Sequence, residues 1–283
     1  MGVIPSQLEL LDRLIEPGMR LLTIGRLTVH ETYLAHHRAN PNSSYFDEFA
    51  RHRYPGVSVD HLDGSDYQGA AIIQDMNLPL TDENRALSGC YDVILDGGSL
   101  EHFFDVPQAI RNYNSLLKVG GLIYISTNAN NHFGHGFYQF SSELFYRVFS
   151  EDNGYEMVDC FLEEHPLLAA EISSSRRFFD AVDPGTLHRR AQFISNRPVL
   201  IHCVARKQRD VEMCRSLIQS DYLEVWSESA SPRKETGRFK GAVKVLFDRV
   251  PVLWRIYDRW KLAVLVKLGR NPDFRKRNSD AGR

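Results

Sequence analysis

Acidic side chains follow three successive apolar runs of the sequence, close to where each run ends. Asp60 and Asp63 lie at the end of the first of these runs, Asp75 follows the second, and Asp96 follows the third. Carboxylates suit the hydroxyls of a ribose and the amino group of an adenine, and they repel phosphates. Because the sequence also lacks a G-x-G-x-x-G motif, the pattern favours a nucleoside cofactor without phosphate over a dinucleotide.

A second group of side chains could take up a proton. His102 lies shortly after Asp96, and His132, His135 and Tyr138 lie in the polar stretch "NNHFGHGFYQF". These are candidates for the general base that a hydroxyl acceptor needs. His102 could instead bond local backbone at a helix start, and the loop histidines could cap neighbouring elements. The two loop histidines lack a clear third ligand, so we predict no metal site.

These side chains need a scaffold of alternating strands and helices. Apolar runs suited to buried strands occupy 19–25, 56–62, 70–75, 91–98 and 120–127, and a closing pair occupies 154–165 and 197–207. Between them, 106–121 has apolar residues at helical spacing, Pro107 near its start and Gly120 near its end. The alternation predicts an α/β fold with a doubly wound, mostly parallel sheet. In such sheets ligands bind beyond the carboxyl ends of the strands.

Three stretches of the sequence resemble the class I S-adenosylmethionine-dependent methyltransferases. Residues 91–130 resemble that family's fourth strand, Leu-Glu-His turn, helix and fifth strand, 72–80 its third strand, and 137–160 its Phe-Ser-x-Glu-Leu helix and sixth strand. The resemblance covers about residues 18–207, and the loop after the fifth strand is similar to methyltransferase-like proteins of bacterial surface-polysaccharide synthesis. It implies a Rossmann-like sheet of seven strands with the last one antiparallel, S-adenosylmethionine as cofactor, and O-methylation of a small-molecule or glycan acceptor.

The resemblance also implies the residues of the site. Gly25 matches the first glycine of the family's cofactor loop, and Asp75 matches the residue that receives the adenine amino group. Asp60 matches the acidic residue for the ribose, but the short interval before Asp75 leaves Asp63 as the alternative. The expected cofactor-binding residues are Gly25, Arg26, Asp60, Asp63, Asp75, Met76, Asp96, Gly97 and Gly98, and the expected catalytic residues are His102, His135 and Tyr138.

The turn after the first strand departs from the family. Thr23 stands where the family has an acidic residue, and Leu27 and Val29 stand where it has its second and third glycines. Arg26 could replace the missing loop amides by pairing with the carboxylate of methionine, or it could be a solvent-facing arginine beside a non-binding turn. The departure therefore leaves a second function open, that of a non-catalytic binding or scaffold protein with the same fold.

Two further features admit two interpretations each. Some quinone-pathway O-methyltransferases use the Glu-His pair of this turn to hold a divalent ion, so His102 could bind a metal ion rather than local backbone. The aromatic residues from Phe137 to Phe149 could form a stacking surface for a sugar, or they could be helix core, which is the commoner use of such a cluster.

Charge is distributed unevenly along the chain. Residues 238–277 carry 12 Lys and Arg against 3 Asp and Glu, whereas the remainder carries 22 against 33. We therefore predict a methyltransferase-like domain at 1–208, a linker or helical connection at 209–237, and a basic amphipathic tail at 238–283. The tail interleaves aromatic and basic residues, which suits an anionic membrane surface, although it could instead pack on the acidic body.

Other bulk properties limit the location and the partners. The net charge of −2 argues against a nucleic-acid-binding protein. The four cysteines include no C-x-x-C pair, and no apolar run approaches the roughly 20 residues of a membrane span. We expect a cytoplasmic protein with peripheral contact at the inner membrane face. The sequence does not indicate the oligomeric state.

Overall fold

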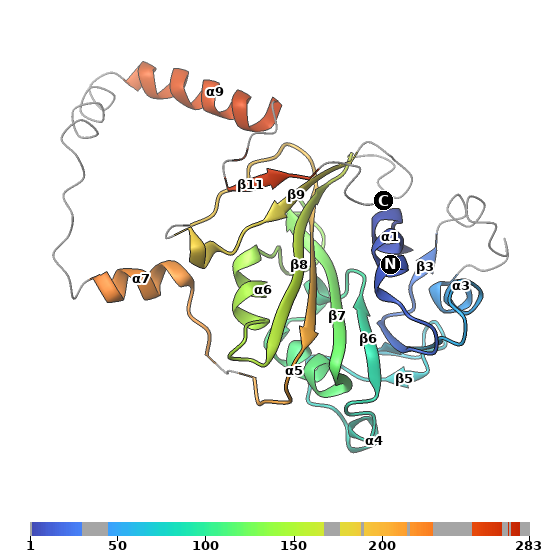
Figure 1. Cartoon of the computed structure of the whole chain (residues 1–283). Coiled ribbons are helices and arrows are strands. Elements are labelled where there is room, and N and C mark those ends of the chain that lie inside the picture. Colours follow the sequence, from blue (N-terminus) through green and yellow to red (C-terminus); the bar gives the residue numbers. More distant parts are fainter. Residues whose placement is uncertain are drawn as a thin grey trace.

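A mixed nine-stranded sheet forms the centre of the molecule (Figure 1). The computed structural model describes residues 2–29, 45–166, 176–187, 190–213, 216–228, 251–267, 271 and 273–277. The strands of the sheet are β2 (Arg20–Ile24), β4 (Ser58–Asp63), β5 (Ile72–Ile73), β6 (Tyr91–Asp96), β7 (Leu117–Asn130), β8 (Tyr155–Glu164), β9 (Arg177–Ala181), β10 (Val199–Lys207) and β11 (Phe274–Lys276). Two short strands, β1 (Gly2–Val3) and β3 (Thr28–Val29), pair separately in parallel.

The strand order confirms the predicted fold class. The sheet runs β11-β9-β8-β10-β7-β6-β2-β4-β5, and the five strands from β7 to β5 are parallel. β10 enters antiparallel between β7 and β8, as the last strand of a class I methyltransferase sheet does. β9 and β11 extend the β8 edge, so the sheet has two strands more than the predicted seven.

Helices cover both faces of this sheet, with α1 (Pro5–Leu14) and α3 (Phe46–Arg53) on one face and α5 (Val106–Leu116) and α6 (Ser142–Val148) on the other. The other described helical elements are α4 (Asp82–Arg85), α7 (Ser220–Glu228), α9 (Pro251–Lys267) and the 3-10 turns η1 (Leu100–His102) and η2 (Pro184–Thr186). Alternation along β7 divides the core, since Ile123 and Ile125 pack with α5 and α6, whereas Leu122 and Tyr124 pack with α1 and α3. Asp105 begins α5 by accepting the Gln108 amide.

The basic tail divides into parts with different surroundings. β11 pairs with β9, and Arg277 makes ion pairs with Asp159 and Asp180 while its guanidinium lies 4.4 Å from the centre of the Phe161 ring. This end of the tail packs on the body. Most described side chains of α9 are exposed, and Trp260 is 62% exposed. Residues 238–250 lie outside the described residues, and the domain boundaries stay predictions.

The described helices include none that is long and apolar enough to cross a membrane. Cys90, Cys160 and Cys203 carry free thiols, and Cys214 lies outside the described residues.

A buried polar network joins α1 to the sheet. The Glu163 carboxylate of β8 accepts a hydrogen bond from Ser6 of α1 at 2.6 Å, and it lies 3.0 Å from His202 Nε2 and 3.2 Å from Arg176 Nε. The other ring nitrogen of His202 lies 2.9 Å from the Tyr124 hydroxyl. Burial alone would raise the pKa of Glu163, but His202, Arg176 and Ser6 outweigh it and lower this pKa. The carboxylate is therefore stabilised in its charged form.

We predict that Glu163→Gln lowers the free energy of unfolding at pH 7 by about 3 kcal/mol, because the variant removes the buried negative charge that Arg176 and His202 face. An acid with a lowered pKa stabilises the fold above its ordinary value and loses this effect as pH falls through the folded value. The wild-type advantage should therefore shrink below about pH 4.5. Urea denaturation of both proteins at pH 7 and below pH 4.5 measures the difference in their free energies of unfolding. The exposed Glu9→Gln variant is the control, with an expected change within about 0.5 kcal/mol, and equal losses in both variants would contradict the assignment.

Candidate active site

The turn after β6 is built around one buried carboxylate. Asp96, the last residue of β6, accepts hydrogen bonds from the amides of Gly98 at 3.0 Å and Ser99 at 2.6 Å, and from the Tyr113 hydroxyl at 2.8 Å. Burial, together with the nearby charge of Glu101, raises the pKa of Asp96 to about 7. Because these internal donors occupy both carboxylate oxygens, Asp96 shapes the turn. Its contact with the cofactor stays a prediction.

The turn after β2 meets the turn after β6 directly. Gly25 has a φ of +76°, a conformation that favours glycine, and its amide donates to the Leu62 carbonyl at 2.7 Å. Ser99 Oγ donates to the Ile24 carbonyl at 2.9 Å. A Cβ placed on Gly25 would lie 3.6 Å from Ser99 Oγ. Both turns therefore lie in contact at the carboxyl edge of the sheet.

The residues that replace the family's later glycines are core residues. Leu27 is buried, and a Cβ placed on Gly97 would lie 3.2 Å from Leu27 Cδ1. Gly97 therefore permits the close approach of Leu27, while Gly98, with a φ of 110°, permits the turn itself. Val29 is also buried and pairs with Val3. Apolar packing takes the place that bare backbone has in the family.

Arg26 is held by contacts within the protein. Its Nη1 donates to the Gln68 carbonyl at 2.9 Å, its Nε lies 3.5 Å from Asp47 Oδ1, and its guanidinium lies 3.8 Å from the centre of the Tyr45 ring. These contacts fix α3 to the turn. Pairing of Arg26 with the carboxylate of methionine stays a prediction.

The structure separates Asp60 from Asp63. Asp60 lies inside β4, where its carboxylate accepts hydrogen bonds from Arg20 Nη2 at 2.7 Å and from the Tyr91 hydroxyl at 3.0 Å. Arg20 and Tyr91 are the first residues of their strands, so the Asp60 carboxylate is engaged toward the amino ends of the strands, and its cofactor role stays a prediction. Asp63 is the last residue of β4, and its Oδ2 would lie 3.9 Å from a Cβ on Gly25. Asp63 therefore lies beside the Gly25 turn, and its ribose role stays a prediction.

Asp75 and Met76 follow β5 and differ in their surroundings. Asp75 is exposed, and its Oδ1 accepts from the Asn77 amide at 2.9 Å and from Asn77 Nδ2 at 2.8 Å. Met76 is buried in the core beside Asn112, whose Nδ2 lies 3.8 Å from its sulfur. Asp75 thus lies after the carboxyl end of β5, with one carboxylate oxygen engaged by its own turn. The Met76 side chain packs in the core under this turn.

A cluster of imidazoles lies beside the Asp96 turn. Glu101 of η1 is buried and accepts from the Thr127 hydroxyl at 2.6 Å, while its Oε1 lies 3.7 Å from His135 Nε2. The ring centres of His102 and His135 are 5.1 Å apart, and those of His132 and His135 are 6.2 Å apart. Burial lowers the pKa of His102 and lowers that of His132 to about 4, so both rings are neutral at pH 7.

Backbone contacts hold the histidine loop against η1. The Phe137 amide donates to the Glu101 carbonyl at 2.7 Å, and a Cβ placed on Gly136 would lie only 2.7 Å from the same oxygen. Gly136 is therefore required for the loop to close over Glu101. The Tyr138 hydroxyl donates to the Phe104 carbonyl at 2.9 Å, so Tyr138 positions the loop, and its catalytic role stays a prediction.

Gly136 and Thr127 were missed in the sequence, and Glu101 was considered only as the metal-binding partner of His102. Only the fold brings Thr127 and His135 to Glu101. Glu101, His102 and His135 offer ligand atoms within 4.8 Å of one another, so these three could hold a divalent cation. This group joins His135 to the Glu-His pair of the turn, whereas the sequence prediction of no metal site considered His135 only together with His132.

The aromatic cluster divides between core and surface. Phe140, Phe145 and Phe149 are buried, as the helix-core interpretation predicts. Phe137 is 67% exposed and meets the 73% exposed Phe104 edge to face, with ring centres 6.1 Å apart. These two rings form an exposed rim beside the histidines.

Comparisons with known proteins give solved structures of low sequence identity. No protein-family model matches the chain, and no curated protein matches its sequence. The 1,6-didemethyltoxoflavin-N1-methyltransferase of Burkholderia thailandensis is 15% identical with a TM-score of 0.41, over 72% of this chain and 77% of that chain. A TehB-like SAM-dependent methyltransferase of Corynebacterium glutamicum is 15% identical with a TM-score of 0.36, over 70% and 85%. These similarities concern the fold alone.

We predict that Asp96 gives the protein a pH-dependent stability that Asp96→Asn removes. A carboxyl group whose pKa is raised by folding binds its proton more tightly in the folded state, so stability falls as pH rises from its ordinary value of 3.8 to about 7. The amide of this variant would keep an oxygen for the two backbone donors and carry no charge. Between pH 4.5 and 7, the free energy of unfolding of the wild type should fall relative to the variant by on the order of 3 kcal/mol. Urea denaturation gives the free energy of unfolding of both proteins at each pH. If the two curves of this free energy against pH are parallel, folding does not raise the pKa of Asp96.

Proposed function

We propose that the chain is an S-adenosylmethionine-dependent methyltransferase that methylates a hydroxyl of a small-molecule or glycan acceptor. The observation that carries this proposal is the pair of carboxylates, Asp63 and Asp75, at the carboxyl edge of neighbouring strands beside the Gly25 turn. Within the described residues Asp63 has no side-chain partner, so it could receive two ribose hydroxyls, and the second oxygen of Asp75 could receive the adenine amino group. These residues fit the nucleoside end of the cofactor.

The cofactor supplies an electrophilic methyl group, so the protein has to position the acceptor and remove a proton. His135 is the base in this proposal, because it stands at the loop tip with Glu101 behind it. Thr127 holds Glu101 by a hydrogen bond, and Glu101 in turn stabilises the imidazolium that forms when His135 takes the acceptor's proton. His102, whose ring faces His135, lines the same position.

A second candidate function is favoured by the apolar packing at the turn after β2. Leu27 packs against Gly97, and the Ser99 hydroxyl donates a hydrogen bond to the Ile24 carbonyl. Both contacts lie where the methionine part of a cofactor would lie. This packing supports a methyltransferase-fold protein that binds or scaffolds without catalysis. Cofactor binding separates the two functions.

The exposed rim supports a ring-shaped acceptor, in line with the surface-polysaccharide resemblance. Phe104 and Phe137 present apolar faces next to polar histidines, which is the mixture that a sugar ring contacts. Isolated exposed aromatics need no explanation, but a pair beside candidate catalytic groups supports a binding role.

We also propose that α9 rests on an anionic membrane at the cytoplasmic side. Ile256, Tyr257 and Trp260 are exposed at helical spacing, and Arg255 and Arg259 share the same helix. Tryptophan and tyrosine suit the headgroup region, and each basic residue near an anionic surface contributes about 1 kcal/mol. Because the rest of the chain is acidic, an anionic surface would repel it and attract the tail.

We predict that S-adenosylhomocysteine binds and that Asp63→Asn weakens this binding by about 10- to 100-fold, through loss of a charged acceptor for the ribose hydroxyls. Asp60→Asn is the matched control: it breaks the contact with Arg20, so it should lower stability and leave the affinity unchanged. Isothermal titration calorimetry measures both. If S-adenosylhomocysteine does not bind at millimolar concentration, the scaffold function is favoured. If both variants lose the same affinity, Asp63 is not the residue that binds the ribose.

We predict that the full chain floats with liposomes that contain phosphatidylglycerol, and that flotation decreases as salt rises. The double variant Trp254→Ser, Trp260→Ser should stay at the bottom of the gradient, because it removes the aromatic contacts of α9. Trp226→Ser, an exposed tryptophan of α7, is the matched control and should float normally. A double variant that floats as well as the wild type would exclude α9 as the membrane contact.

A further inference from the structure

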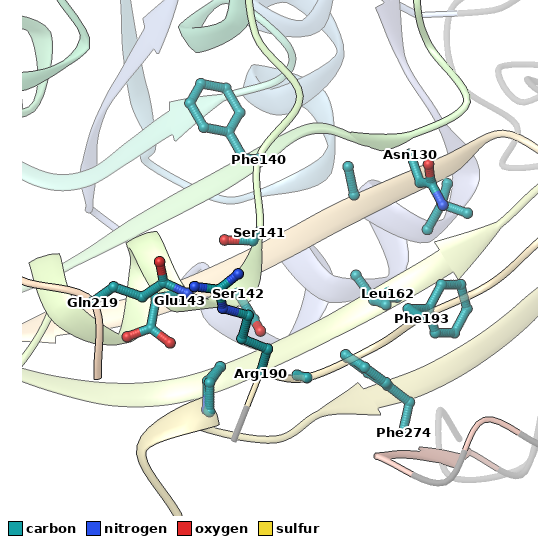
Figure 2. A pocket seen from close by; sticks show the side chains of 14 residues that line it. Asn130, Phe140, Ser141, Ser142, Glu143, Leu162, Arg190, Phe193, Gln219 and Phe274 are labelled. Carbon is teal, nitrogen blue, oxygen red and sulfur yellow. The ribbon is translucent and has the colours of Figure 1, made fainter. Parts of the chain in front are cut away.

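A cavity of about 380 Å³ opens at the base of the histidine loop (Figure 2). Ala129 and Asn130 line it where β7 ends, and Phe140 lines it where the loop returns. The outer wall comes from segments outside the seven-stranded arrangement, with Phe193 before β10 and Phe274 in β11. The additions to the fold therefore build a cavity of the size that small ligands occupy.

The two sides of the cavity differ in polarity. Leu162, Phe193 and Phe274 lie together on one side, and Phe193 meets Phe274 edge to face with ring centres 5.1 Å apart. Glu143 and Arg190 lie on the other side (Figure 2). A ligand here would bury an apolar face against the aromatic wall and keep its polar groups toward the opposite side.

The charged groups of the cavity are already engaged by the protein. Glu143 accepts hydrogen bonds at 2.9 Å from both the amide and the hydroxyl of Ser220, and it lies 3.4 Å from Arg147 Nε, while the same guanidinium also pairs with Asp183. Arg190 Nε donates to Asp221 at 2.7 Å. A charged ligand would lose its hydration here, and an anion would also meet the two carboxylates that share Arg147, so the cavity favours a neutral ligand.

We propose that this cavity binds a neutral, mainly apolar ring of the methyl acceptor, a statement that rests on the proposed function. Ala129 of the cavity and Thr127, which holds Glu101, lie two residues apart on one face of β7, a separation of about 7 Å. A ring seated in the cavity thus lies within one small molecule's length of His135. The cavity selects the acceptor, and the histidine loop carries the base.

The test uses 2-naphthol and 2-naphthoate as probes of the full chain at pH 7, where the first is neutral and the second is an anion. Calorimetry should show that 2-naphthol binds and that 2-naphthoate binds about tenfold more weakly or less, because its charge has to be desolvated. Ala191→Phe fills the cavity from its wall, and Gln219→Trp blocks it from an exposed position. Each should weaken 2-naphthol binding by about tenfold or more, without changing the affinity for S-adenosylhomocysteine.

Trp260→Ser controls for binding of the probe to α9 and should bind 2-naphthol as the wild type does. Gln219→Trp keeps the test valid if Ala191→Phe fails to fold. Wild-type affinity for 2-naphthol in both cavity variants, or equal affinity for the naphthoate, overturns the proposal. If 2-naphthol binds as stated but S-adenosylhomocysteine does not bind at all, the proposed function fails and the acceptor assignment falls with it, whereas the neutral-ligand site stands.

Discussion

The buried carboxylate of Asp96 is the interaction on which the geometry of the carboxyl edge depends. It ends β6, gathers the amides of Gly98 and Ser99, and binds the Tyr113 hydroxyl of α5. The turn that results places Ser99 against the end of β2 and begins η1, which carries Glu101 and the neighbouring His102. One desolvated acid therefore sets both the cofactor side and the acceptor side of the candidate site, at the cost that its pKa is raised to about 7.

Contact between the turns after β2 and β6 explains the glycine-poor cofactor loop. Leu27 lies where a later glycine would stand, but it packs inward against Gly97, and Val29 continues into the short β1–β3 sheet. Leu27 and Val29, which stand where the family has bare backbone, are therefore core residues. In the proposed site this packing departs from the family pattern where the methionine part of the cofactor would lie, whereas Asp63 and Asp75 would serve the nucleoside part.

The sequence predicted those features that depend on neighbours in the chain. Buried apolar runs indicated the parallel strands, and the helical spacing after Pro107 indicated α5, because both patterns reflect local periodicity. It could not assign Asp60, since the partners Arg20 and Tyr91 are 40 and 31 residues away and become neighbours only through strand register. For the same reason it missed the contact of Glu101 with Thr127, and the cavity, whose walls come from β7, α6, β8 and the added β11.

The most direct measurement of the central claim is a crystal structure of the chain with S-adenosylhomocysteine. The proposed site predicts that the ribose hydroxyls lie within hydrogen-bond distance of Asp63, with the adenine beside Asp75 and the sulfur toward His135. The Leu27 side chain should either keep its contact with Gly97 or move aside for the homocysteine end. Density for the ligand at any other place, or an empty crevice in crystals grown at millimolar ligand, would contradict a cofactor site at this edge.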